Sequence, residues 1–293
     1  MADKTYRCPI CAGAEFAVFA RMRTPYLDRR EVYDVACCTQ CGHGIAEGRK
    51  DGAWLSEIYS TGFHNTSQQS SEDKDAPVNM NARARIDWIR ATYSSGRLLD
   101  IGAGTGAFVR AASNVFEAEG IELAEDTARK AREEGLNIHT GDFMSADLPT
   151  EGYAVITMWD VLASLKEIVA AVERCHDLLQ PGGRLIITVP MIDSLSARAL
   201  RRLWPLLIPP VNLHYFTRSS LRRLADSSGF ELENITFPGK KVSLQFVAQK
   251  AARSVGLHGV VQHVEKFTPA WPVTVNTGDI AQVVMRKSNA ALS

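Results

Sequence analysis

Strand and helix patterns alternate along the chain from about residue 80, and this alternation limits the possible folds more than any other feature. Five apolar runs are typical of buried strands, at residues 97–101, 118–122, 137–139, 153–158 and 184–189. Helical patterns precede or separate them at about 80–93, 105–115, 125–134 and 165–179. Alternating strands and helices of this kind form a parallel sheet with helices on both faces. The sequence therefore predicts an α/β fold with a mostly parallel sheet.

The pattern becomes less regular after the last of these strands. Residues 192–217 combine a short amphipathic helix with three prolines, which interrupt helices, and we interpret this stretch as a cap segment. Beyond it, the sequence predicts a helix at 219–228 that ends before a glycine, a strand at 230–237, a helix at 242–255 and a last strand at 280–286.

Cysteines are concentrated near the start of the chain. Cys8 and Cys11 form one Cys-x-x-Cys pair, and Cys38 and Cys41 form a second. Four thiolates complete a tetrahedral zinc site, and the two-residue spacing lets one turn direct both sulfurs at the same ion. We therefore predict a zinc ribbon over residues 1–50, with a small hairpin near residues 31–35 and a structural rather than catalytic ion. Cys37 is an alternative to Cys38 as the third ligand.

A polar segment separates the predicted ribbon from the alternating region. We predict that residues 51–79 form a linker and mobile loop, because the stretch is poor in large apolar side chains. The α/β domain would then extend over residues 80–290. We find no internal repeat in the sequence.

The overall charge excludes a general attraction to polyanions. The 293 residues carry 33 basic and 33 acidic side chains, so nucleic acid is not an expected partner. Residues 194–253 are locally basic, with ten Lys or Arg against three acidic residues, which most often marks a solvated surface. The sequence has no apolar run of membrane-spanning length and no apolar leader at its start, so we expect a cytoplasmic protein.

The most specific motif joins the first predicted strand to its helix. Asp100 lies at the end of the strand, and Gly102, Gly104 and Gly106 follow in a tight turn. Such a turn lets backbone amides approach a polar ligand, but the spacing also fits a dinucleotide fingerprint. Glu122, at the end of the next strand, is placed to accept hydrogen bonds from ribose hydroxyls in either case.

Several further motifs distinguish between these two cofactors. Gly141-Asp142-Phe143 follows the third strand, and residues 178–187 read as a helix end, a Gln-Pro-Gly-Gly turn and a strand. Taken in this order, the motifs over residues 80–290 resemble those of the class I S-adenosylmethionine-dependent methyltransferases, small-molecule type. The resemblance implies a Rossmann-like methyltransferase fold, S-adenosylmethionine as cofactor and methyl transfer as the reaction.

The resemblance also implies roles for single residues. Gly102, Gly104 and Gly106 would line the methionine part of the cofactor, and Asp100 would organise the loop and its contacts to the amino group. Glu122 would hold the ribose. The remaining cofactor residues would be Asp142 at the adenine amino group, Phe143 beside the adenine ring, and Trp159, for which simple wall packing is an equal alternative.

The acceptor side is less defined by sequence. Many relatives carry a Glu-His pair where this chain has Ala163-Ser164, so a base at that position is absent. Residues 212–217 resemble the substrate-cap region of small-molecule members, some of which carry an N-terminal zinc ribbon. His214 is the first candidate for a general base because imidazole titrates near neutral pH, and Tyr215 is the second.

We therefore predict an enzyme that methylates a small molecule, with oxygen of a sugar or specialised metabolite as the expected acceptor. Two alternatives remain open at this stage. One is an RNA methyltransferase that uses the ribbon for recognition, and the other is a non-catalytic cofactor-binding scaffold. The sequence does not identify the acceptor atom or the oligomeric state.

Overall fold

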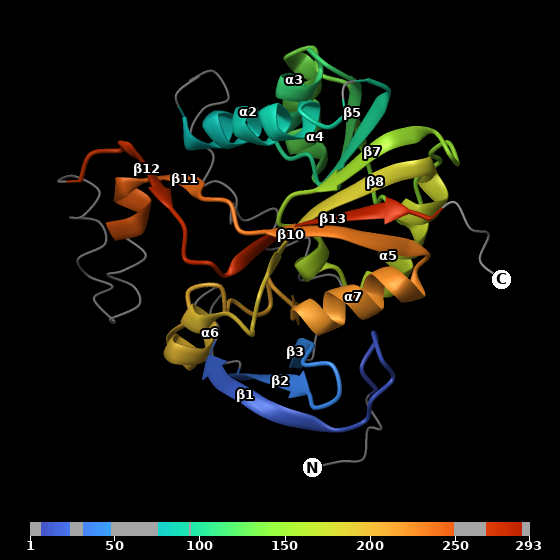
Figure 1. The fold of residues 1–293 in the computed structure, drawn as a ribbon. Coiled ribbons are helices and arrows are strands. Elements are labelled where there is room, and N and C mark those ends of the chain that lie inside the picture. The colour runs from blue at the N-terminus through green and yellow to red at the C-terminus, as the bar shows by residue number, and fades with distance from the viewer. Residues whose placement is uncertain (1–6, 24–31, 48–75, 94, 249–267, 289–293) are drawn as a thin grey trace.

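A twisted seven-stranded sheet forms the centre of the molecule. The computed structural model describes residues 7–23, 32–47, 76–93, 95–248 and 268–288. The strand order in the sheet is β10-β13-β8-β7-β4-β5-β6 (Figure 1). The bounds are β4 Arg97–Ile101, β5 Glu117–Glu122, β6 Ile138–Thr140, β7 Tyr153–Met158, β8 Leu179–Pro190, β10 Phe230–Thr236 and β13 Ile280–Lys287.

Five of the seven strands run parallel, and the antiparallel pairings lie at one edge. β4 pairs in parallel with β5 and β7, β5 with β6, and β7 with β8. β13 is antiparallel to both β8 and β10. The carboxyl ends of the five parallel strands therefore meet at one edge of the sheet, where ligands of α/β folds bind.

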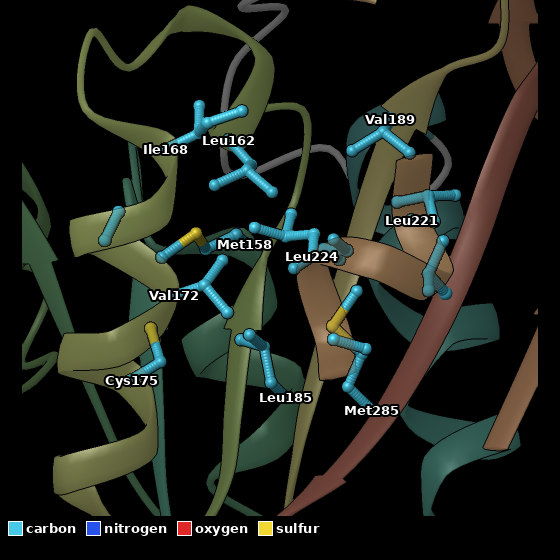
Figure 2. Packing of buried hydrophobic residues seen from close by; sticks show 14 of the residues in the cluster. Met158, Leu162, Ile168, Val172, Cys175, Leu185, Val189, Leu221, Leu224 and Met285 are labelled. Carbon is cyan, nitrogen blue, oxygen red and sulfur yellow. The ribbon is translucent and has the colours of Figure 1, made fainter. Parts of the chain in front are cut away.

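Helices cover both faces of this sheet, because successive strand residues point to opposite sides. Leu98, Val155 and Ile186 pack against α2 Pro77–Arg90 and α3 Ala107–Ala112. On the other face, Met158 and Leu185 pack with Val172 of α5 Ile168–Leu178 and Leu224 of α7 Arg218–Ser227 (Figure 2). α4 Glu125–Glu133 packs beside α3. The result is the predicted three-layer α/β architecture.

A second sheet combines the N-terminal region with the cap segment. Its order is β1-β2-β3-β9, with β1 Phe16–Arg23, β2 Val32–Cys38, β3 Gly44–Glu47 and β9 His214–Tyr215. The last strand comes from the cap, which also holds α6 Leu195–Leu200 and the 3₁₀ turn η2 Arg201–Leu203. Figure 1 shows this sheet beside α6 and α7. The ribbon region is therefore joined to the catalytic domain by backbone pairing.

The structure agrees with most of the expected elements and corrects some. The helix predicted at 165–179 is present but begins later, at Ile168 of α5, and the 3₁₀ turn η1 at residues 162–164 precedes it. The expected helix at 242–255 is wrong at its start, where β11 Lys240–Ser243 pairs with β12 Pro272–Val275. Asn81 on α2 fixes this strand through hydrogen bonds to the Lys241 backbone in both directions. Residues 244–248 are helical, and residues 249–255 lie outside the described part.

The predicted linker at 51–79 lies outside the described residues except for 76–79, which belong to the start of α2 and its N-cap. The predicted boundary between the ribbon and this linker, at residues 50 and 51, also lies outside the described residues and stays a prediction. Among the described residues, no helix has the length and apolar character that crossing a membrane would need.

Candidate functional site

The glycine-rich turn lies at the carboxyl end of β4 and leads into α3. All three of its glycines have positive φ, at +73° for Gly102, +55° for Gly104 and +76° for Gly106. A side chain on Gly106 would lie 2.3 Å from Leu136 Cδ1, whereas one on Gly104 would meet nothing within 4 Å. At Gly106 the positive φ favours glycine and a side chain would also displace Leu136, whereas the space in front of Gly104 is open to a ligand.

Glu122 at the end of β5 is directly connected to this turn. Its carboxylate accepts a hydrogen bond from the Gly104 amide at 2.9 Å and another from the Ala124 amide at 2.9 Å. The structure thus brings together two residues that the sequence assigned to different parts of one ligand. The carboxylate is partly exposed at the edge of the sheet.

Asp100 lies behind the turn and is almost completely buried. The Thr157 hydroxyl on β7 donates to its Oδ1 at 2.6 Å. Burial raises the pKa of Asp100 to about 7. The hydrogen bond from Thr157 and the positive charge of Arg85 oppose this shift but are smaller. A buried carboxyl of this kind beside an open turn is typical of functional sites.

Asp142 and Phe143 follow β6 at the same edge of the sheet. Asp142 is exposed and its Oδ1 accepts a hydrogen bond from the Met144 amide at 2.9 Å, so its carboxylate orders the turn. Phe143 points into the core, and Arg174 on α5 donates to its carbonyl at 2.7 Å. The contacts of Asp142 and Phe143 in the structure are all within the protein. Their roles at the adenine of the cofactor stay predictions.

Trp159 and Asp160 follow β7, and Asp160 lines a pocket that the sequence did not reveal. The Trp159 ring packs edge-on against Phe108 at 5.1 Å, and the Arg85 guanidinium lies 4.2 Å from its centroid. Asp160 has a φ of +63°, a conformation that costs energy for a residue with a side chain. Such strain at a strand end points to a functional constraint.

The Asp160 carboxylate is fixed from two sides. Thr188 on β8 donates to Oδ1 at 2.9 Å, and Lys240 on β11 donates to Oδ2 at 2.6 Å. Burial would raise the pKa of Asp160, but the charges of Lys240 and Arg85 and these bonds outweigh it and hold the pKa well below its usual range. Asp160 is therefore ionised at neutral pH.

A pocket of about 400 Å³ opens beside these groups, between α2, β11 and the start of β13. Arg85, Asp160, Lys240 and Gln282 contribute polar groups to its lining, and Trp88 and Phe237 contribute aromatic surface. Arg85, Lys240 and Gln282 were not predicted as site residues from the sequence. The only signal in the sequence was the position of Arg85 on the helix before the glycine turn, which does not indicate where its side chain lies.

The two candidate bases lie away from this pocket. His214 is 4% exposed, and its Nδ1 lies 3.0 Å from Nε2 of His43, which belongs to the ribbon. Burial lowers the pKa of His214 to about 4, although bonds to the backbone of Lys166 and Leu165 oppose this shift. Tyr215 is fully buried, and its hydroxyl donates to the Asn212 carbonyl at 3.2 Å. Their catalytic roles stay predictions, and neither side chain lines the described pocket.

The four predicted zinc ligands come together at the tip of the ribbon. The sulfurs of Cys8, Cys11, Cys38 and Cys41 all lie within 4.8 Å of one another. Cys8 Sγ is 3.6 Å from Cys41 Sγ, and Cys11 Sγ is 3.5 Å from Cys38 Sγ. Sulfurs bound tetrahedrally to zinc would be about 3.8 Å apart, so this donor set fits the ion. Cys37 is not part of the cluster.

Comparisons with known proteins agree on the catalytic region. A family model described as a methyltransferase domain matches residues 51–235. Ubiquinone biosynthesis O-methyltransferase from Xylella fastidiosa (strain 9a5c) is 28% identical over 182 residues, covering 54% of this chain and 74% of that protein. The protein of the same name from Xanthomonas oryzae pv. oryzae (strain PXO99A) is 24% identical over 182 residues, covering 54% and 76%.

Solved structures show the same fold. Magnesium protoporphyrin IX methyltransferase from Synechocystis PCC 6803, determined with bound SAH, has a TM-score of 0.53 at 15% identity and covers 81% of this chain and 100% of that one. The family match extends over more than half of the chain and includes the glycine turn, Glu122 and β7. The chain therefore belongs to the class I S-adenosylmethionine-dependent methyltransferases.

Proposed function

We propose that this enzyme transfers the methyl group of S-adenosylmethionine to an oxygen of a small molecule, with a sugar or specialised metabolite as the expected acceptor class. The observation that carries the proposal is the arrangement at the sheet edge. The open space at Gly104, the carboxylate of Glu122 and the buried Asp100 lie at the same edge of the sheet as the pocket that Asp160 lines. Cofactor and acceptor would thus meet at the carboxyl ends of β4 and β7.

The cofactor residues fit the chemical groups of S-adenosylmethionine. Gly102, Gly104 and Gly106 would leave room for its methionine part, and Asp100 would pair with the cofactor's amino group. Glu122 would exchange its backbone contacts for ribose hydroxyls. Asp142, Phe143 and Trp159 would complete the site around the adenine and the sulfonium.

Arg85 adds a positive charge on the methionine side. Within the described residues its guanidinium forms no hydrogen bond or ion pair, and it faces Asp100 and Asp160 only electrostatically. A partly buried guanidinium without hydrogen-bond partners is costly unless a ligand satisfies it. We therefore add Arg85 to the site as a partner for a carboxylate or another oxygen-bearing group.

The pocket would hold the acceptor. Lys240 uses one of its three donors on Asp160, and the Gln282 side chain, 5% exposed as a residue, has no hydrogen-bond partner among the described residues. These donors suit an acceptor rich in oxygen, and Trp88 and Phe237 offer apolar walls. The oxygen acceptor also agrees with the two O-methyltransferases that this chain is similar to.

Catalysis would depend mainly on alignment. When bound, S-adenosylmethionine would supply an electrophilic methyl group to the acceptor oxygen, and the proton of that oxygen would pass to a base or to solvent. Since the sulfonium is already an activated donor, holding the reactants close and in line supplies most of the acceleration. His214 and Tyr215 are retained as predicted bases, although their buried positions favour a role in holding the cap.

We also propose that the four clustered cysteines bind a structural zinc ion. Four thiolates leave no coordination position for a substrate, so the ion would stabilise the ribbon and take no part in methyl transfer. Its loss would be expected to act through the ribbon and the cap.

Calorimetric titration of the purified, metal-quantified protein with S-adenosylmethionine, and in parallel with NAD, tests the proposed function. We expect micromolar binding of S-adenosylmethionine and no heat with NAD. Methyl transfer from labelled cofactor to a panel of hydroxylated small molecules and to RNA then tests the acceptor class. Transfer to RNA alone would overturn the small-molecule proposal.

A further inference from the structure

The outer surface of the cap segment exposes an unusual combination of side chains. Leu195, Leu200 and Leu203 are 85%, 42% and 54% exposed. Arg198, Arg201 and Arg202 lie between them and are exposed as well. We call these six residues the cap patch. Single exposed leucines are ordinary, but three within nine residues, interleaved with three arginines, are not explained by the fold of the cap.

Other residues of the same segment already anchor the cap. Ala197 and Trp204 are buried, and Trp204 Nε1 donates to Asp279 Oδ2 at 2.7 Å. The Ser196 hydroxyl donates to the same carboxylate oxygen at 3.0 Å. α6 therefore has an inward side that fixes it and an outward side that carries the leucines. Within the described residues, the exposed leucines of the outward side belong to no apolar cluster, and Arg201 alone of the six patch residues packs on a ring, that of Phe19.

The positive charge of the cap patch favours a partner with a negatively charged surface. Residues 194–217 contain no acidic residue. Within the described part of the chain, Arg198 and Arg202 have no ion-pair partner, and Arg201 lies over the Phe19 ring at 4.8 Å. A second copy of the chain is disfavoured, because a symmetric contact would place these arginines against their own copies. The leucines are unsuited to the polar backbone of a nucleic acid.

We propose that the cap patch docks the enzyme on an anionic lipid bilayer. The leucines would enter the boundary between headgroups and acyl chains, and the arginines would pair with lipid phosphates. This surface docking requires no membrane-spanning segment and does not depend on the identity of the acceptor. Asp279, which Ser196 and Trp204 hold, also lines the pocket, so docking would place the proposed acceptor site next to the bilayer.

Vesicle co-sedimentation of the full-length, zinc-loaded protein tests this proposal. We expect binding to vesicles that contain phosphatidylglycerol, little binding to phosphatidylcholine alone, and release by high salt. The double variant Arg198→Gln/Arg202→Gln should weaken binding by about tenfold or more, since each arginine near an anionic surface contributes to the attraction. Leu200→Ser/Leu203→Ser should weaken it to a similar degree.

The matched control is Arg222→Gln/Arg223→Gln on α7, which removes the same charge from an exposed helix surface without leucines. It should bind vesicles like the wild type. Thermal unfolding should show that all three variants remain folded. Equal loss of binding in the control, or no binding of wild type to the anionic vesicles, would overturn the proposal. So would self-association that the leucine variant abolishes without any vesicle binding.

Discussion

The ribbon sheet and the seven-stranded sheet are stabilised in different ways. Strands β4, β7 and β8 are covered by helices on both faces, and most of their residues are buried among apolar side chains. The ribbon sheet buries its own apolar residues partly against the cap. Its core combines Val35 and Ala46 with Trp204, Leu207 and Tyr215, all three of which belong to the cap.

This shared core makes the ribbon and the cap one structural unit, although the cysteine end of the ribbon also packs against the core of the catalytic domain. β3 pairs with β9, and the Thr217 hydroxyl, which caps α7, donates to the Cys41 carbonyl at 2.8 Å. His43 stacks on His214 between the two segments. A metal at the cysteine cluster would therefore stabilise the cap, whereas the cofactor edge of the seven-stranded sheet is built without it.

Metal removal should produce the largest difference between the two regions. Structural zinc contributes on the order of 10 kcal/mol to the folding of small metal domains. We expect chelation, or Cys41→Ser, to remove hydrogen-exchange protection from β2, β3 and β9 while β4, β7 and β8 stay protected. The control Cys37→Ser should retain one zinc per chain. Loss of protection throughout the seven-stranded sheet would contradict the division into two units.

The Thr217 hydroxyl offers a smaller test of the link. Thr217→Ala removes both the N-cap of α7 and the bond to Cys41, and we expect it to lower the free energy of unfolding by about 2 kcal/mol. Ser194→Ala removes only the cap of α6, whose bond to the Ala197 amide is 3.2 Å long, and should cost about 1 kcal/mol or less. Denaturant unfolding measures both variants. Equal losses would show that the bond to the ribbon contributes nothing.

The smallest expected effect is a pH dependence of cofactor binding, which would arise from Asp100 in the catalytic sheet and not from the ribbon. Burial raises the pKa of Asp100 to about 7, so this carboxyl is protonated in the free protein below that pH. If it pairs with the amino group of the cofactor, binding must release the proton, and affinity should rise as pH rises toward 7 and then level off. Calorimetry of wild type and Asp100→Asn measures the effect, which the variant should lose.

The strands of the catalytic sheet are more predictable from the sequence than those of the ribbon unit. β4 and β7 have the predicted bounds, because a buried parallel strand requires a continuous apolar run that the sequence displays. β9 has two residues, and its pairing with β3 depends on a segment about 170 positions away. No local pattern indicates such a contact.

The candidate site shows the same limit. The motif residues Asp100, Gly104 and Glu122 are recognisable because they lie at strand ends with a fixed spacing. Lys240 bonds to Asp160 from β11, and Arg85 acts on it from α2 through its charge alone. In the sequence, both side chains resemble any solvated cation. The strained backbone of Asp160 is likewise visible only in three dimensions.

The central claim, that the glycine turn binds the cofactor independently of the ribbon, is tested most directly by comparing two glycine variants. Gly104 and Gly135 both have positive φ, and an added side chain would meet nothing within 4 Å at either position. We predict that Gly104→Arg lowers the affinity for S-adenosylmethionine by at least about 100-fold while zinc content is unchanged, and that Gly135→Arg binds like the wild type. Unchanged affinity in Gly104→Arg, or equal losses in the two variants, would contradict the account.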